Sequence, residues 1–191
     1  MPVPTIHMLI AKKVNPNADI DFYVGNLAPD AITAGEIKNK VHLYDASDWE
    51  DALRKFAFKA NNDYLKGMVL HLFADRKFHV FWNENTNFPW QESKEFWEKY
   101  REYNRQIDSY AYHNTEWAYS LYEEMENWDY SGFSKTDFIT RDDLKSAIME
   151  HRQWLIENKF DLPSVFPPSF VEKFVDSSAE DFNRWFSNLK S

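Results

Sequence analysis

The chain has 191 residues and a formal net charge of −9, because 22 Lys and Arg stand against 31 Asp and Glu. It has no cysteine, which excludes disulfides, thiolate zinc sites and a cysteine nucleophile. Only four glycines are present, which disfavours glycine-rich phosphate loops and all-β folds with many tight turns. The acidic balance argues against nonspecific binding to nucleic acid or anionic lipid. Histidines, carboxylates and hydroxyls therefore remain as the groups that could carry chemistry.

Hydrophobic residues recur with helical spacing along nearly the whole chain, and no segment has a convincing strand pattern. We therefore expect an all-α protein with one domain over residues 1–191. In chain order, helices are predicted over 5–13, 19–26, 47–60, 63–84, 91–128, 140–158, 169–176 and 178–189. The stretch 91–128 is either one long helix or two helices with a kink near 109–114.

Several boundaries have local signals. Residues 31–46 are predicted to be irregular, since they hold a glycine and a cluster of charges. Ser47 and Glu50 form a capping-box pattern at the start of the next helix. Asn62 is a predicted cap for the long helix that follows, and Thr140 opens the helix over 140–158. A turn is expected over 85–89.

The N-terminal sequence MPVPTIHMLIAKKV has only a short apolar run, broken by His7. It has no basic leading region and no small-residue cleavage site, so it does not resemble a signal peptide. No stretch approaches the ~20 apolar residues that a membrane span needs. We therefore expect a cytoplasmic protein without integral membrane association.

The helix over 63–84 carries the strongest chemical signal. His71 and Asp75 are four residues apart, so both side chains can reach one metal ion from the same face. His79 lies two turns from His71 and could serve a second ion. The alternative is a hydrogen-bonded His–Asp pair in the core. Taken singly, the pattern favours other roles for three further residues: a hydrogen-bonded core histidine for His7, an N-cap or Asx-turn residue for Asp30, and a loop histidine for His42.

Together these residues match a family. The segments HMLIAKKVNPNADIDFYVGNLAPDAI, KNKVHLYD and GMVLHLFAD resemble the small intracellular branch of the bacterial zinc-dependent phospholipase C family. The single-strand-specific zinc nucleases share its helical fold. The resemblance covers the motif region 1–82, whereas the remainder 83–191 shows only helical character. It implies a single multi-helical domain of the zinc-dependent phospholipase C and zinc nuclease type.

The resemblance also implies ligands. Asp30, His42, His71 and Asp75 match the family's ligands for one zinc. We expect Asp30 also to act as the general base or to orient the metal-bound water, since a ligand can still accept that hydrogen bond. His7 matches a ligand of a neighbouring zinc, with Asp75 bridging the two ions. In secreted members the processed N-terminal residue completes that neighbouring site, and this chain begins with Met1-Pro2 instead.

A further zinc of the family uses later histidines and a glutamate, and here the spacing departs from its pattern. His79, His113 and Glu116 are the candidates for such a site. The alternative is that His113 and Glu116 lie on a solvated helix face. His151 is predicted to be a surface residue, and Asp45 is a candidate to orient the His42 ring.

The implied function is a hydrolase that holds one to three zinc ions, or another divalent transition metal. It would cleave a small phosphoester through a metal-activated water, with no nucleic acid as a stable partner. Nucleotides and other phosphomonoesters are further candidate substrates, and the oligomeric state stays open. The alternative is a non-catalytic helical protein with a structural or vestigial metal site. Four cations lie near the ligands in the sequence, namely Lys38, Lys40, Arg76 and Lys77. They could bind a phosphate or be ordinary surface charge.

Two glycines flank the motif helices, Gly25 and Gly67. We expect them where helices pack closely around a buried site.

Overall fold

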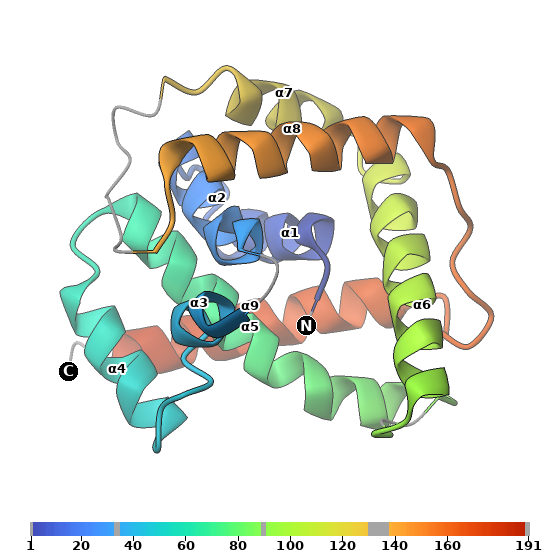
Figure 1. Cartoon of the computed structure of the whole chain (residues 1–191), viewed down its shortest axis with the longest axis horizontal. Helices are drawn as coiled ribbons and strands as arrows, with labels where there is room; N and C mark the ends of the chain where they lie inside the picture. The colour runs from blue at the N-terminus through green and yellow to red at the C-terminus, as the bar shows by residue number, and fades with distance from the viewer. Residues whose placement is uncertain (1, 33–34, 89–90, 130–137, 190–191) are drawn as a thin grey trace.

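The computed structural model describes residues 2–32, 35–88, 91–129 and 138–189, and its regular elements within these ranges are helices (Figure 1). The all-α prediction is therefore confirmed. In chain order the elements are α1 (Pro4–Val14), α2 (Ile20–Leu27), the 3₁₀ helix η1 (Ala28–Ala31), α3 (Gly35–Val41), α4 (Trp49–Lys59), α5 (Asp63–Asn85), α6 (Lys94–His113), α7 (Ala118–Glu126), α8 (Arg141–Glu157) and α9 (Phe170–Asn188).

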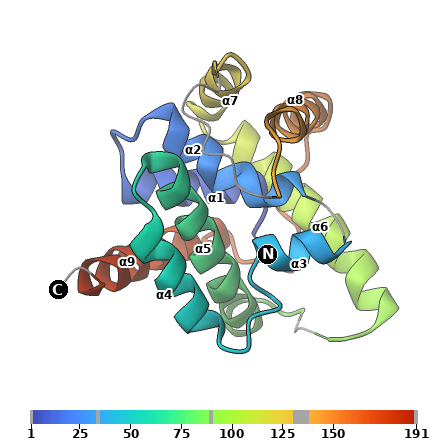
Figure 2. The same cartoon turned by 60° about the vertical axis from the view of Figure 1, so that its left-hand side comes forward.

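The long helix α5 lies at the centre of the contacts and packs against α2, α4 and α9. Helix α1 packs against α2, α9 and α6, so it runs through the interior of the molecule. Helices α7 and α8 pack against each other and cover α1 and α2 from one side (Figure 2). Helix α8 also contacts η1 and α6, which closes the fold around α1.

The α2–α5 crossing is unusually close, as the two glycines predict. A Cβ on Gly25 would lie 1.9 Å from the carbonyl oxygen of Tyr64, and one on Gly67 would lie 2.1 Å from that of Phe22. Neither site has room for any side chain, because the obstructing atoms are backbone. The side-chain amide of Asn26 donates to the carbonyl of Gly67 at 3.2 Å and ties the helices together.

An aromatic core fills the space between the second half of α5 and the chain around α9. Phe78 and Trp82 are fully buried, and Phe78 contacts Phe170 and Phe174 edge-on. The indole Nε1 of Trp82 donates to the carbonyl of Phe88, so this large side chain is buried without an unpaired donor. These contacts hold the C-terminal end of α5 in the core, beyond His71 and Asp75.

The structure corrects three predicted boundaries. Residues 35–41 form α3 within the stretch expected to be irregular. The N-cap of α4 is Asp48, whose side chain accepts from the Asp51 amide, so the Ser47 capping box does not form. The predicted helices over 169–176 and 178–189 are one helix, α9, in which the buried Ser178 continues the packed face.

Helix α3 ends in a turn that a sequence pattern does not reveal. The amide of Tyr44 donates to the carbonyl of Asn39, and that of Leu43 donates to the carbonyl of Lys40. This is the Schellman arrangement, in which the position of Leu43 is most often glycine. Leu43 adopts a φ of 60°, a left-handed conformation that costs a non-glycine residue about 1–2 kcal/mol. The turn places His42, the residue before it, against α5.

The other boundaries agree with expectation. Asn62 and Thr140 accept from the amides of Leu65 and Asp143 and cap their helices as predicted. The stretch 91–128 holds two helices, α6 and α7, separated after His113. Part of the turn expected over 85–89 lies outside the described residues, since Pro89 is not described.

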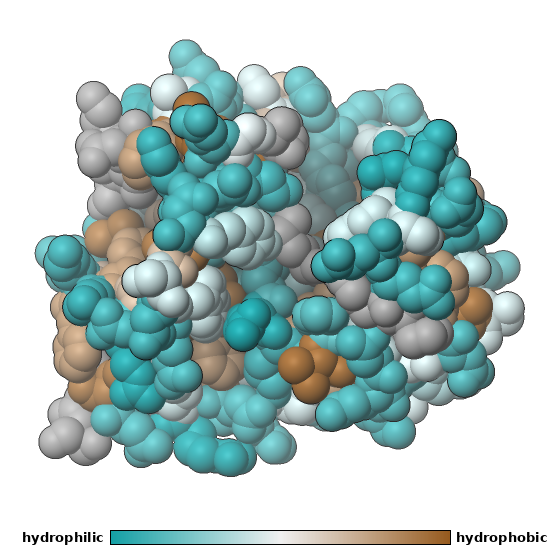
Figure 3. All heavy atoms as spheres, turned by 60° about the horizontal axis from the view of Figure 1, so that its bottom comes forward, coloured by the Kyte–Doolittle hydropathy of each residue, from teal (hydrophilic) through white to brown (hydrophobic). Residues whose placement is uncertain are grey.

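Hydrophilic side chains cover most of the face seen in Figure 3, and its apolar patches are small and separate. Among the described residues, no helix combines the length and the apolar character that crossing a membrane requires.

Candidate metal centre

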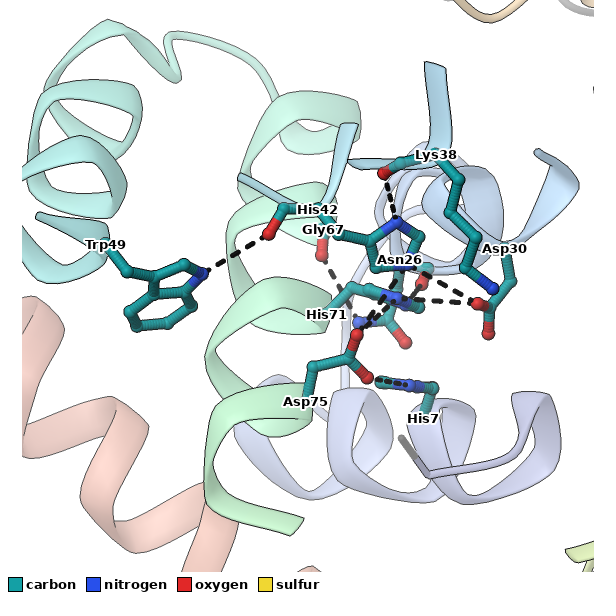
Figure 4. A network of polar contacts seen from close by, with 9 residues as sticks. All are labelled: His7, Asn26, Asp30, Lys38, His42, Trp49, Gly67, His71 and Asp75. Carbon is teal, nitrogen blue, oxygen red and sulfur yellow. Dashed lines mark hydrogen bonds and ion pairs between the residues drawn. The ribbon is translucent and has the colours of Figure 1, made fainter. Parts of the chain in front are cut away.

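Five side chains from four elements converge on one buried point between α1 and α5, and we call this set the His/Asp cluster (Figure 4). Its members are His7 of α1, Asp30 of η1, His42 after α3, and His71 and Asp75 of α5. The side chains of the three histidines are 0% exposed, that of Asp75 is 6% exposed and that of Asp30 is 18% exposed. Asp30 is therefore the member most open to solvent.

Two histidine nitrogens and two carboxylate oxygens form the centre of the cluster. Nε2 of His42 lies 3.6 Å from Oδ1 of Asp30 and 3.7 Å from Oδ2 of Asp75. Nε2 of His71 lies 3.9 Å and 3.6 Å from the same two oxygens. Ligand atoms about 2.0–2.1 Å from a tetrahedral ion are about 3.3 Å apart, so these spacings are close to those of a metal shell.

His7 lies on the other side of Asp75. Its Nε2 is 3.3 Å from Oδ1 of Asp75, the oxygen that does not face His42 and His71. Its ring stacks on that of His71 at 3.9 Å between centroids. His7, His71 and Asp75 therefore form a second group that shares residues with the first, and Asp75 can bridge the two.

The atoms of the cluster that face one another include several that are buried without a hydrogen-bond partner. Nε2 of His7, His42 and His71 and both carboxylate oxygens of Asp75 are in this condition. Leaving such groups unpaired in the interior costs about 1–3 kcal/mol each, and more for a charge. Divalent cations held by the two groups would contact these atoms, and imidazole with carboxylate is a donor set that zinc accepts. The residues present therefore fit a metal.

The backbone fixes the orientation of two of the rings. Nδ1 of His71 donates to the carbonyl of Asn26 at 2.8 Å, and Nδ1 of His42 donates to the carbonyl of Lys38 at 3.0 Å. With its proton on Nδ1, each neutral imidazole keeps the lone pair of Nε2 for the cluster. Asp45, the candidate for orienting His42, is exposed, and a carbonyl does this work instead.

The charges of the cluster interact strongly. Burial alone would raise the pKa of Asp30, but the neighbouring imidazoles of His71 and His42 outweigh it and lower the pKa to about 2. The pKa of Asp75 is likewise lowered, by His71 and His7 against the effect of burial. Burial lowers the pKa of His7, whereas the charges of Asp75 and Asp30 overcome burial and raise that of His71. Both carboxylates are thus held in the ionised form that binds metals.

Two cavities meet the cluster from different sides. The first, of about 700 Å³, reaches His42 and Asp75, and we call it the aromatic cavity after Tyr44, Trp49, Trp97 and Tyr100 in its wall. The second, of about 710 Å³, reaches Asp30, and we call it the acidic cavity after Asp30, Asp108, Asp143 and Glu150 in its wall. Three residues, Val3, Pro4 and Asn104, line both cavities.

Cations gather in the aromatic cavity. Lys38 of α3, Arg76 of α5 and Arg101 of α6 all line it. Lys38 and Arg76 belong to the cations that the sequence places near the ligands, whereas Lys77 instead pairs with Asp181 and Lys40 lies over Phe138. Sequence reasoning missed Arg101, because its distance along the chain from the motif region gave no signal.

The remaining candidate ligands lie elsewhere. His79 is exposed and lines the aromatic cavity without joining either metal-binding group of the described residues. Nε2 of His113 lies 3.0 Å and 3.1 Å from the carbonyl oxygens of Leu155 and Asn158, so this ring holds the end of α8. Glu116 is exposed in the turn after α6, and hence does not share a helix face with His113. Met1, the expected N-terminal ligand position, lies outside the described residues.

His151 is the one histidine whose surface prediction needs correction. Its side chain is only 24% exposed, and its Nε2 lies 3.0 Å from Oδ2 of the buried Asp108.

Comparisons of this chain with protein-family models, with curated proteins and with solved structures found no match.

Proposed function

We propose that the chain is a metal-dependent hydrolase of small phosphoesters, with zinc or another divalent first-row transition metal held by the His/Asp cluster. The observation that carries this proposal is the set of four facing atoms, Nε2 of His42 and His71 with one oxygen each of Asp30 and Asp75. All four come from residues that the resemblance to zinc-dependent phospholipases C matches to ligands. Their burial without hydrogen bonds favours a cation over a simple polar core.

The choice of a phosphoester rests on the surroundings of the cluster. The aromatic cavity brings Lys38, Arg76 and Arg101 to the same space as His42 and Asp75. Guanidinium groups bind phosphoryl oxygens through paired, charge-assisted hydrogen bonds. The protein has a net charge of −9, yet three cations lie beside the metal-binding cluster. The local electrostatic field there is therefore suited to an anionic substrate.

Each residue then has a task. A bound divalent metal would supply Lewis acidity and lower the pKa of water. Lys38, Arg76 and Arg101 bind and orient the phosphoryl oxygens. Asp30, the most exposed member of the cluster, orients the attacking water by accepting its hydrogen bond, and its low pKa keeps it ionised for this role. The carbonyls of Asn26 and Lys38 hold the imidazoles in place.

A structural metal site is the second candidate, because four protein donors can close a tetrahedral shell. In that case a metal would stabilise the fold, and no substrate would be turned over.

One experiment separates the two. The protein is purified without a histidine tag, analysed for bound transition metals, stripped with a chelator and reloaded with zinc, cobalt or manganese. The loaded protein is tested on bis-p-nitrophenyl phosphate, a choline phospholipid and nucleotides. Hydrolysis that is lost in Asp75→Asn and kept in His113→Gln supports the hydrolase. Stabilisation by metal without hydrolysis supports the structural site, and no metal binding contradicts both.

A further inference from the structure

A buried acid–base pair lies in the acidic cavity, and neither the cluster nor its ligands account for it. Asp108 of α6 is 3% exposed, and His151 of α8 reaches it across the cavity. Oδ2 of Asp108 lies 3.0 Å from Nε2 of His151, and its Oδ1 accepts from the backbone amide of Thr5 at 3.0 Å. Both oxygens of this carboxylate are therefore engaged, which fixes its position.

Asp108 is held in place by α1, the helix that also carries His7 of the cluster. Thr5 lies in the first turn of α1, whose N-cap residue Val3 has no side-chain oxygen to offer. Asp108 supplies the missing acceptor from α6, where its negative charge is also favoured by the dipole of α1. His7 lies two residues further along α1, so this helix contacts Asp108 and also contributes a member of the cluster.

The His151 ring is held from both sides. It lies 5.8 Å from the ring of Tyr122 and 6.3 Å from that of Trp154, between centroids. Since Nε2 faces Asp108, Nδ1 is the ring nitrogen left for a ligand, and it has no hydrogen-bond partner among the described residues. His151 and Asp30 line the same cavity, so a molecule bound in it can lie between the two.

We propose that His151, positioned by Asp108, is the general acid that delivers a proton to the leaving group of a phosphoester bound at the His/Asp cluster. The proposal rests on the proposed function and adds to it the protonation of the leaving group. Asp108 is a positioning residue, because it acts through the imidazole.

The proton balance of the step is simple. A bond forms between the water oxygen and phosphorus, and the bond between phosphorus and the alcohol oxygen breaks. The electrons of the broken bond stay on that oxygen, which takes the proton from Nδ1 of His151 and leaves as a neutral alcohol. The imidazole becomes neutral and keeps its Nε2 proton toward Asp108. The proton that the attacking water gives up passes to solvent, from which His151 is recharged.

The charges around the ring favour this role. Burial lowers the pKa of His151, but the negative charges of Asp108 and, more weakly, Asp30 overcome it and raise the pKa above its usual value. A raised pKa increases the share of the imidazolium form at neutral pH, and this is the form that a general acid needs. The other titratable and charged side chains that line this cavity are Asp30, Arg105, Asp108, Tyr122, Asp143 and Glu150.

The test compares two leaving groups. Bis-p-nitrophenyl phosphate releases a stabilised anion that needs no proton, whereas a methyl p-nitrobenzyl phosphodiester releases an alkoxide that does. Metal-loaded wild type, His151→Gln and the control His113→Gln are measured on both, with circular dichroism to check folding. We expect His151→Gln to lower kcat about 10²–10⁴-fold on the alkyl ester and less than about tenfold on the nitrophenyl ester. His113→Gln should leave the ratio of the two rates unchanged.

Each other result has a distinct meaning. Equal losses on both substrates would show a structural role for His151 and overturn the general acid alone. Wild type that hydrolyses neither substrate overturns the proposed function, and the acid role falls with it. If His151→Gln does not fold, the pH dependence of wild type tests the proposal. The rate of hydrolysis of the alkyl ester should fall at high pH with the pKa that NMR assigns to the His151 ring, and the rate on the nitrophenyl ester should not. A ring pKa at or below 6.5, or the same basic limb for both substrates, contradicts the proposal.

Discussion

The carbonyl oxygen of Asn26 accepts a hydrogen bond from Nδ1 of His71 at 2.8 Å, and this contact joins the α2–α5 crossing to the His/Asp cluster. The carbonyl lies in the last turn of α2, which ends at Leu27. The Asn26 side chain bonds Gly67 across the same crossing. One residue therefore sets both the distance between two helices and the orientation of a metal ligand.

Replacing Asn26 with alanine should lower both the stability of the fold and the affinity of the cluster for a metal. The variant leaves the Gly67 carbonyl without its side-chain donor in a fully buried position, at a cost of about 1–3 kcal/mol of unfolding free energy. It also loosens the backbone that orients His71, so zinc affinity should fall about 10–100-fold. Urea denaturation and competition with a zinc indicator measure the two effects. Unchanged zinc affinity in a folded variant would contradict the positioning role.

The close α2–α5 crossing predicts that replacing Gly67 with alanine destabilises the protein, the reverse of its usual effect in a helix. Alanine is favoured over glycine by about 1 kcal/mol in a helix interior. Here its Cβ would meet the Phe22 carbonyl oxygen at 2.1 Å, and forcing the helices apart should cost about 1–3 kcal/mol beyond that gain. Gly67→Ala should therefore lower the unfolding free energy, whereas Lys66→Ala, one residue earlier, should change it by less than ~1 kcal/mol. A stabilised Gly67→Ala would mean that the helices are not in contact there.

Zinc should raise the melting temperature by binding the folded state alone. At a free metal concentration 100 times the dissociation constant, the gain is about 2.7 kcal/mol, or about 5–10 °C for a chain of this length. His71→Ala and Asp75→Ala should abolish the shift, because each removes a donor shared by the two metal-binding groups or bridging them. His79→Ala should keep it. Scanning calorimetry with and without zinc checks this, and a full shift in His71→Ala would rule out the cluster.

The cations of the aromatic cavity predict a change in KM. Arg101→Met keeps the length of the side chain but removes its charge, so binding of a phosphoester anion should weaken about tenfold or more. Because this binding is present in the ground state as well, KM should rise with little change in kcat. Lys40→Met, outside the cavity wall, is the matched control. Steady-state kinetics on bis-p-nitrophenyl phosphate would falsify the assignment if both variants behaved alike.

The Asp108–His151 pair predicts a pH-dependent stability. The pKa of His151 is raised in the folded state above the unfolded value of 6.5. Its contribution to the free energy of unfolding is therefore fully present below pH 6.5 and is lost as the pH rises through the folded pKa. Wild type should exceed His151→Gln in stability by more at pH 5.5 than at pH 9. Urea denaturation across this range tests it, and in an Asp108→Asn background the pH dependence should disappear.

Much of the fold follows from local sequence signals. Helical periodicity places most of the helices, and Asn62 and Thr140 cap theirs as their side chains predict. The failures have physical causes. Helix α3 ends in a Schellman turn with Leu43 where glycine is usual, so no local signal marks it. Helix α9 continues through Ser177-Ser178 because Ser178 is buried against the fold, which overrides a weak local break.

For the site, the residue types and one pairing of ligands could be predicted before the structure was known. His71 and Asp75 share a helix face because they are four residues apart, and the lack of cysteine left imidazole and carboxylate as the available donors. The order of His7, Asp30 and His42 indicated further ligands only through a family resemblance. Their separation along the chain gives no geometric constraint, since the distances between them depend on how four elements pack.

Tertiary structure alone decided what surrounds these residues. Arg101 reaches the aromatic cavity and Asp108 meets His151 only because α6 packs against α1 and α8. The sequence suggested His113 as a metal ligand and His151 as a surface residue, yet His113 contacts carbonyls at the end of α8 and His151 is the one paired with a buried carboxylate. Helical periodicity specifies which residues share a face of one helix. Which faces meet is set by the packing of the whole core, and that is where the cluster, its cations and the buried acid–base pair are assembled.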